Sequence, residues 1–166
     1  MTTNERDDLL ESLTTHRGFL LRTVQGLTDD QARQRSTVSE LTLGGLIKHV
    51  AKVESGWVDF ILNGPDGREM NENSYAEHLD SFVLHEDETL AGALADYEKV
   101  AQRTDELVRT LPDLGAAHPL PQAPWFKPGA TRSARRAFIH IVAETAQHAG
   151  HADILREAID GQKTMG

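Results

Sequence analysis

Three histidines and a glutamate near the C-terminus are spaced in a pattern that suits metal or acid–base chemistry. His140, Glu144, His148 and His151 follow one another at intervals of four, four and three residues. On an α-helix, which turns about 100° per residue, these intervals place all four side chains in a stripe about 80° wide. A solvated helix face normally carries mixed charges, and a core face carries aliphatic side chains. This stripe is neither, so we expect it to have a chemical or a special packing role.

The same residues could form part of a metal site between two helices. Glu144 and His148, one helical turn apart, can chelate one ion, and a third ligand must then come from another helix. His49 is the best candidate, because it borders the apolar face of a predicted helix at about 43–62. Two imidazoles and one carboxylate suit Zn²⁺, Fe²⁺ or Ni²⁺, and three protein ligands leave coordination positions open for chemistry. The alternative is a buried polar network in which the imidazoles and Glu144 satisfy one another.

Apolar periodicity predicts the helices that must position these side chains. The pattern gives no strand signal and favours long helices at about 5–27, 43–62, 86–111 and 133–159. It therefore indicates an all-α protein, a four-helix bundle in one domain spanning residues 1–166. The segment Thr28–Gln31 reads as a capping box. The Gly44–Gly45 pair would let another segment approach the backbone closely at the start of the second long helix.

Two long connections interrupt this pattern, one after the second long helix and one before the last. Residues 68 to about 85 show no clear period, and long connections in compact domains are often functional or mobile. Residues 112–132 hold five of the six prolines, together with Trp125 and Phe126. That segment is either a plug over one end of the core or a wall of a substrate pocket. Trp57, Trp125 and Phe126 are the candidate residues for contacting a cofactor or substrate.

Composition excludes some classes of partner and chemistry. The 17 basic and 26 acidic residues give a net charge of −9, which argues against nucleic acid or an anionic membrane as the main partner. Without cysteine there is no disulfide and no thiol nucleophile of the protein's own. The first residues lack the pattern of a signal peptide, and no apolar run approaches the ~20 residues of a membrane span. A cytoplasmic location is the default expectation.

Two stretches resemble the DinB/YfiT-like bundle proteins. The sequence from Thr42 to Trp57, TLGGLIKHVAKVESGW, resembles their second helix, and HIVAETAQHAGHAD from His140 resembles their final-helix signature, H-xxx-H-xxx-H-R-G-Q. The resemblance covers nearly the whole chain. It implies a four-helix bundle with up-down-down-up connectivity, usually a homodimer. It also implies a divalent metal bound by His49, Glu144 and His148.

The chain departs from the common family pattern at two positions of the stripe. Many relatives carry His at position 144, but the mycothiol-dependent maleylpyruvate isomerase branch is similar to this chain in using Glu. His151 stands where many relatives carry Gln, and it could support a ligand, be a fourth ligand or move protons. His140, a turn earlier, suits a supporting or core role. His140 and His151 are the candidate acid–base residues.

The resemblance also implies a class of reaction. Some relatives join low-molecular-weight thiols such as mycothiol or bacillithiol to electrophiles, and others look like hydrolases. A bound metal lowers the pKa of a thiol, so that the nucleophilic thiolate exists at neutral pH. We therefore expect a metal-dependent enzyme that activates such a thiol. The alternatives are a metal-dependent hydrolase, a bundle that binds a ligand without turnover, and a structural protein whose histidines form a packed or pH-sensitive interface.

Overall fold

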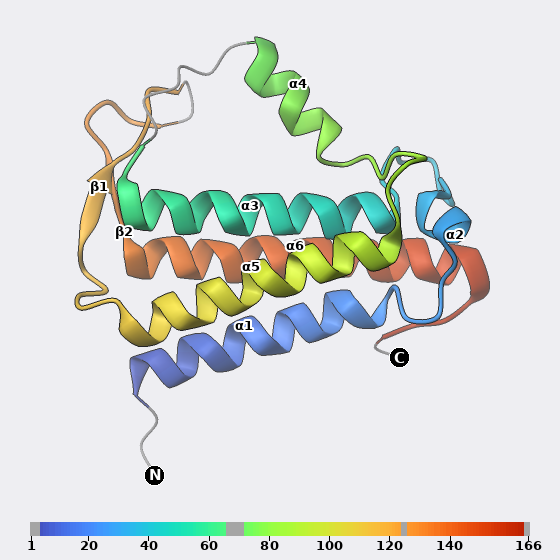
Figure 1. Ribbon diagram of the computed structural model, residues 1–166, viewed down its shortest axis with the longest axis horizontal. Coiled ribbons are helices and arrows are strands. Elements are labelled where there is room, and N and C mark those ends of the chain that lie inside the picture. Colours follow the sequence, from blue (N-terminus) through green and yellow to red (C-terminus); the bar gives the residue numbers. More distant parts are fainter. Residues whose placement is uncertain (1–3, 66–71, 124–125, 165–166) are drawn as a thin grey trace.

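Each long helix begins where a side chain caps its free backbone N–H groups. The computed structural model describes residues 4–65, 72–123 and 126–164. The capping side chains accept hydrogen bonds from amides two or three residues further on, and they are those of Asn4, Thr42, Thr89 and Ser133. The helices that follow are α1 (Glu5–Arg22), α3 (Leu43–Asn63), α5 (Leu90–Thr110) and α6 (Ala134–Asp160). The predicted four-helix bundle is thereby confirmed (Figure 1).

Shorter elements occupy the connections. The predicted capping box of Thr28 and Gln31 opens α2 (Asp29–Arg33). The connection after α3, which shows no clear period in the sequence, contains α4 (Glu72–Asp80). The described side chains of α4 are half-buried or exposed, so this helix has no buried apolar face that a sequence pattern would reveal. The expectation of no strands is wrong in one detail, because β1 (Ala117–Pro119) pairs antiparallel with β2 (Thr131–Ser133). Strands of three residues are too short to show an alternating pattern.

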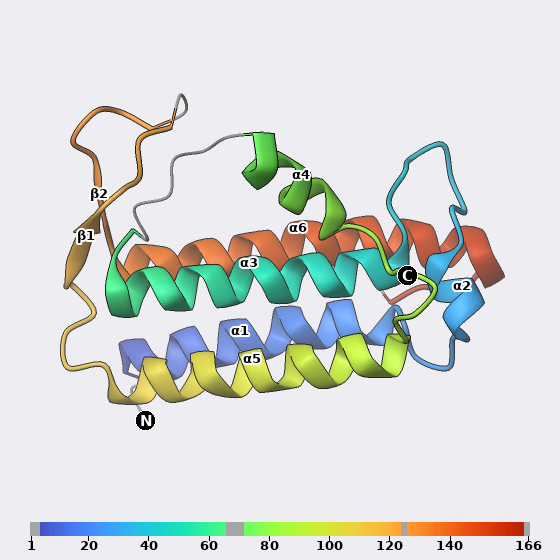
Figure 2. The same cartoon turned by 45° about the horizontal axis from the view of Figure 1, so that its top comes forward.

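The long helices are connected in an unusual order. α1 and α6 run in one direction and α3 and α5 in the other, which is the up-down-down-up order that the resemblance implies (Figure 1). α1 packs along α6, and α3 packs against both α5 and α6. α4 lies outside the bundle on the side of α3 and α6 (Figure 2). Of the helices that the structure describes, none has the length and apolar character needed to cross a membrane.

The bundle interior has two apolar regions separated by a polar layer. One region contains Leu46 and Leu155 near α2, and the other contains Leu13 and Phe138 near the strands. Between them along the helices lie the buried polar residues Arg17, Glu54, Thr104 and Thr145. Within this layer the guanidinium of Arg17 binds Glu54 at 2.5 Å and Asp105 at 2.7 Å. The charges are thus paired where the bundle excludes water.

Candidate metal centre

The packing of α3 against α6 brings the three predicted ligands together. One ligand atom each from His49, Glu144 and His148 can be chosen so that all lie within 4.8 Å of one another. His49 and His148 are buried, and Glu144 is half-buried. Bonds from a transition metal to these atom types are about 2.0–2.2 Å long, so small side-chain rotations would let all three reach one ion. Two imidazoles and a carboxylate are a donor set that fits a divalent transition metal.

Ser81, just after α4, fixes the orientation of His49. The Ser81 hydroxyl lies 2.9 Å from Nδ1 of His49 and donates to the carbonyl oxygen of His78 at 2.6 Å. Because a hydroxyl has only one proton, its oxygen must accept from the N–H at Nδ1 of His49. This tautomer leaves Nε2 of His49 unprotonated and able to bind a metal, a common arrangement around metal-binding histidines.

Phe82 completes the packing around His49. Its ring stacks on the imidazole with centroids 3.7 Å apart and an angle of 16° between the planes. The backbone of this segment lies against Gly45, where a Cβ atom would lie 2.6 Å from the carbonyl carbon of Phe82. The close approach expected at Gly44–Gly45 is therefore made by the segment that covers His49.

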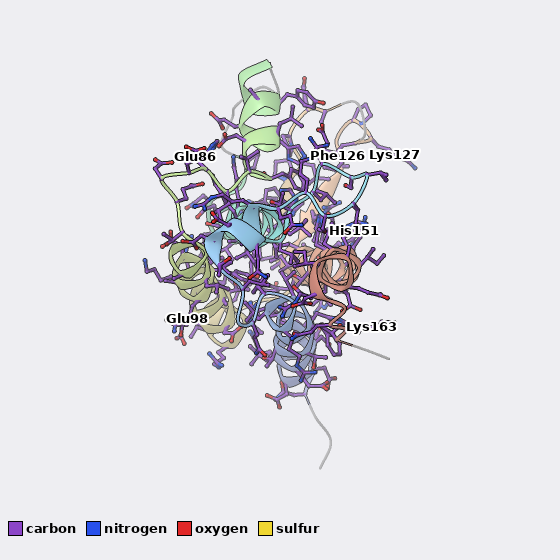
Figure 3. All side chains as sticks on the ribbon, turned by 90° about the vertical axis from the view of Figure 1, so that its right-hand side faces the viewer. Glu86, Glu98, Phe126, Lys127, His151 and Lys163 are labelled. Carbon is purple, nitrogen blue, oxygen red and sulfur yellow. The ribbon has the colours of Figure 1, made fainter. Side chains whose placement is uncertain are left out.

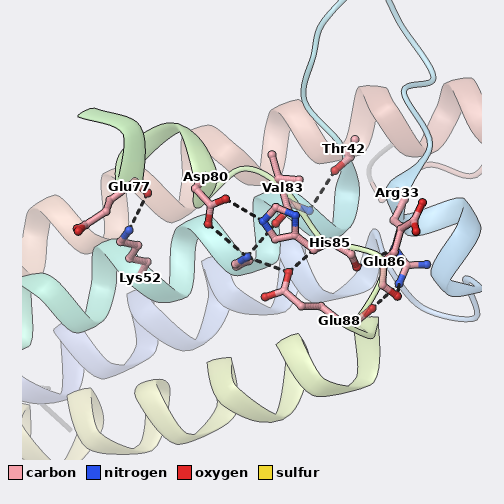
Figure 4. A network of polar contacts seen from close by, with 11 residues as sticks. Arg33, Thr42, Lys52, Glu77, Asp80, Val83, His85, Glu86 and Glu88 are labelled. Carbon is pink, nitrogen blue, oxygen red and sulfur yellow. Dashed lines mark hydrogen bonds and ion pairs between the residues drawn. The ribbon is translucent and has the colours of Figure 1, made fainter. Parts of the chain in front are cut away.

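Lysines of α3 hold this covering segment in place (Figure 4). Lys52 donates to the carbonyl oxygen of Glu77 at 2.7 Å, and Lys48 donates to that of Val83 at 3.0 Å and to the Glu88 carboxylate at 2.8 Å. His85 adds a contact of 2.8 Å to Asp80. These bonds fasten the end of α4 and the residues after it to α3. They explain why Ser81 and Phe82 remain over His49.

The electrostatic environment keeps the histidine ligands neutral. Burial, followed by the positive charge that His148, His78 and Lys52 can carry, lowers the pKa of His49 to about 3. Burial also lowers the pKa of His148, and the Glu144 carboxylate partly opposes that effect. A neutral imidazole is the form that binds a metal, so at neutral pH no proton has to be removed from these rings.

The two candidate acid–base residues flank the ligands along α6. His140 Nε2 lies 3.4 Å from one oxygen of Glu144, and His148 Nε2 lies 3.5 Å from the other. Nδ1 of His151 lies 3.4 Å from Nδ1 of His148. The stripe is therefore a continuous chain of contacts on α6. His140 and His151 each touch a candidate ligand directly.

Trp57 and Phe126 lie near the N-terminal end of the polar stripe on α6. The ring of Trp57 contacts His140, with centroids 5.0 Å apart. Cζ of Arg132 lies 4.7 Å from the centroid of Trp57 and 5.5 Å from that of Phe126. The end-on view in Figure 3 places Phe126 on the same side of the bundle as His151. Trp125 lies outside the described residues.

A separate groove lies between α1 and α5 and is distinct from the metal centre. Its volume is about 630 Å³, and its lining includes Leu21, Leu94 and Tyr97. None of the three candidate metal ligands lines it. The size of this groove therefore does not make it the candidate active site, which lies at the ligand atoms between α3 and α6.

Sequence reasoning missed Ser81, Phe82 and Arg132. The first two follow α4, a segment without recognisable periodicity, and their closeness to His49 arises only from tertiary packing. Arg132 did carry a signal, because it stands eight residues before His140 and so continues the spacing of the polar stripe. It lies just before the predicted last helix, outside the range over which helical spacing applies.

Comparisons with known proteins agree with the fold. A crystal structure of a conserved protein from Enterococcus faecalis superposes with a TM-score of 0.70 and 12% sequence identity, over 97% of this chain and 100% of that chain. YfiT from Bacillus subtilis, described as a probable metal-dependent hydrolase with an unusual four-helix bundle topology, superposes with a TM-score of 0.66 and 19% identity, over 93% and 87% of the two chains.

Sequence comparison identifies the family. The search of curated proteins found no match. The family model described as mycothiol-S-transferase matches residues 8–161, which includes both helices that carry the candidate ligands. The chain therefore belongs to the mycothiol-S-transferase family and has the DinB/YfiT-like fold.

Proposed function

We propose that this protein is a metal-dependent transferase that joins a low-molecular-weight thiol, of the mycothiol or bacillithiol type, to an electrophile. The observation that carries the proposal is the meeting of His49, Glu144 and His148 in a chain of the mycothiol-S-transferase family. The donor set suits zinc, nickel or iron. The protein has no cysteine, so the thiol would come from the cofactor.

Each residue of the site has a distinct role in this proposal. His49, through Nε2, and the side chains of Glu144 and His148 would hold the metal. When bound, the metal supplies a positive charge that lowers the pKa of a coordinated thiol. His140, neutral and beside Glu144, would accept the thiol proton or return a proton to the product. His151 would orient His148 through the contact between their Nδ1 atoms.

The same residues could instead activate water, which would make the protein a hydrolase. The similarity of its fold to YfiT, described as a probable metal-dependent hydrolase, favours this second candidate. The two reactions differ in their need for a thiol. Turnover that rises with added mycothiol or bacillithiol and consumes it stoichiometrically identifies the transferase. Thiol-independent cleavage identifies the hydrolase, and tight binding without any product identifies a ligand-binding bundle.

Metal analysis tests the proposal first. Untagged wild type, His148→Ala and His16→Ala are loaded with Zn²⁺, Ni²⁺ or Fe²⁺, desalted and measured by elemental analysis. His16 is a matched control, since it lies on α1 and is not one of the three candidate ligands. We expect close to one metal per chain in wild type and His16→Ala and a large loss in His148→Ala. Wild type that retains no metal would reject both enzyme proposals.

We also propose that the chain forms a homodimer, as the resemblance implies. Light scattering coupled to size-exclusion chromatography measures the mass directly. A mass near twice the 18.3 kDa of one chain supports the proposal, and a mass near that of one chain rejects it.

A further inference from the structure

The polar stripe of α6 continues beyond its histidines as two arginines. Arg136 lies four residues before His140 on α6, and Arg132 lies four residues before Arg136, in the middle of β2. Within the described parts of the chain, no carboxylate pairs with either guanidinium. Several other arginines do have carboxylate partners, and these are Arg17, Arg103, Arg135 and Arg156. Arg132 and Arg136 therefore form a local positive charge without a carboxylate partner among the described residues, in a protein with a net charge of −9.

Arg132 is held in a way that leaves its donors available. Its guanidinium lies over the rings of Trp57 and Phe126. A cation–π contact of this kind does not use the guanidinium N–H groups as hydrogen-bond donors, and the planar set of N–H groups suits a carboxylate. Burial and the charge of Arg136 lower the pKa of Arg132, so a nearby anion would relieve an unfavourable environment.

A series of contacts connects this arginine to the metal centre. Arg132 touches Trp57, Trp57 touches His140, and His140 touches Glu144. Along α6, the eight residues from Arg136 to Glu144 correspond to about 12 Å at 1.5 Å per residue, and a long arginine side chain can cover part of that distance. This is a distance that a small molecule extended along this face of α6 would span.

We propose that Arg132 and Arg136 form a carboxylate-binding subsite, and that the protein acts on a small acid whose carboxylate they bind while its reactive group lies at the metal centre. The reaction of the acid at the metal centre rests on the proposed function. The binding of a carboxylate by the arginines does not, since the arginines do not need the metal in order to bind an anion. The carboxylate could belong to the electrophile or to the thiol.

Succinate is a suitable probe, with the neutral succinamide as its counterpart. Binding is followed by calorimetry and by the fluorescence of Trp57 in a Trp125→Phe background, because Trp57 contacts Arg132 directly. In metal-free protein we expect millimolar succinate binding and no succinamide binding. Arg132→Gln should raise the Kd of succinate at least tenfold. Succinate binding that is equal in wild type and Arg132→Gln would overturn the proposal.

Arg135→Gln is the matched control. Arg135 neighbours Arg136 in sequence, and its substitution by Gln removes the same charge as Arg132→Gln. Its side chain, however, binds Glu5. We expect less than a twofold change in the Kd of succinate for this variant. A change as large as that of Arg132→Gln would mean that only the overall charge matters, and would also overturn the proposal. Metal content, measured on the same variants, should be unaffected by Arg132→Gln, so that failure of the subsite and failure of the metal site are told apart.

N-acetylcysteine, which carries both a thiol and a carboxylate, shows which substrate provides the acid. In metal-loaded protein, N-acetylcysteine that displaces succinate from wild type, and binds more weakly to Arg132→Gln, assigns the carboxylate to the thiol substrate. Binding of both together supports the same subsite and assigns the carboxylate to the electrophile.

Discussion

Gly45 lies so close to Phe82 that a side chain at position 45 would overlap the Phe82 carbonyl group. Gly45 is in the first turn of α3, and Phe82 stacks on His49 one helical turn further along. The absence of a Cβ atom at position 45 therefore decides how closely the segment with Ser81 and Phe82 can cover the candidate metal ligand.

Gly45→Ala tests this dependence. The added methyl group would push the Phe82 backbone outward, and overpacking of this kind costs about 1–3 kcal/mol of unfolding free energy. We expect this loss in chemical denaturation, together with weaker metal binding, because His49 would lose its contact with Ser81. Gly56→Ala in the same helix is the control, since nothing lies within 4 Å of its added Cβ. That variant should be neutral or more stable by about 0.5–1 kcal/mol. Equal effects of the two substitutions would contradict this explanation.

Features of this protein that depend on local sequence pattern were predictable, and those that depend on distant packing were not. The starts of α3 and α6 were predictable because Thr42 and Ser133 cap these helices, whereas α5 begins at Leu90, four residues later than expected. The meeting of His49 with Glu144 and His148 was expected from helix faces and family resemblance. The Gly44–Gly45 pair indicated a close approach but could not identify its partner. Such partners depend on how segments distant in sequence pack, and α4 has no periodic pattern that would have located Ser81.

Ser81→Ala should weaken metal binding by about 10–100-fold, the usual cost of losing a group that orients a ligand. Without the hydroxyl acceptor, the Nδ1–H tautomer of His49 would lose the hydrogen bond that favours it. Ser81→Thr keeps the hydroxyl and should restore most of the affinity. Competition with a chromogenic chelator measures the affinities. Nitrogen-15 NMR of the metal-free protein reports the tautomer, which a purely structural role of Ser81 would leave unchanged. Unchanged affinity and tautomer in Ser81→Ala would refute the orienting role.

The metal-free protein should lose stability in mild acid because of His49. Its pKa is about 3 in the folded chain and about 6.5 when unfolded, so the unfolded state binds more protons between these values. Stability from this group is therefore complete above pH 6.5 and falls as the pH drops toward 3. The expected loss between pH 7 and pH 5 is on the order of 2 kcal/mol. Urea denaturation of wild type and His49→Gln at both values measures it. A variant with the same pH dependence as wild type would rule out His49 as the cause.

Arg17→Met should destabilise the bundle far more than Arg103→Met, although both arginines bind a carboxylate at similar distance. The side chains of Arg17 and Glu54 are 7% and 1% exposed, whereas those of Arg103 and Asp59 are 46% and 55% exposed. Removing Arg17 leaves a buried carboxylate without its cation, which typically costs about 3–5 kcal/mol. The exposed pair contributes only about 0–1 kcal/mol, because water and salt screen it.

A double variant separates the ion pair from simple loss of packing. Arg17→Met with Glu54→Leu removes the stranded charge and keeps apolar volume in the polar layer, so it should recover much of the stability lost in Arg17→Met alone. Urea denaturation of the single and double variants gives the coupling energy between the two positions. If the double variant were less stable than Arg17→Met by the full cost of Glu54→Leu, the two side chains would be energetically independent. The buried contact between them would then contribute nothing to the stability of the layer that joins the two halves of the core.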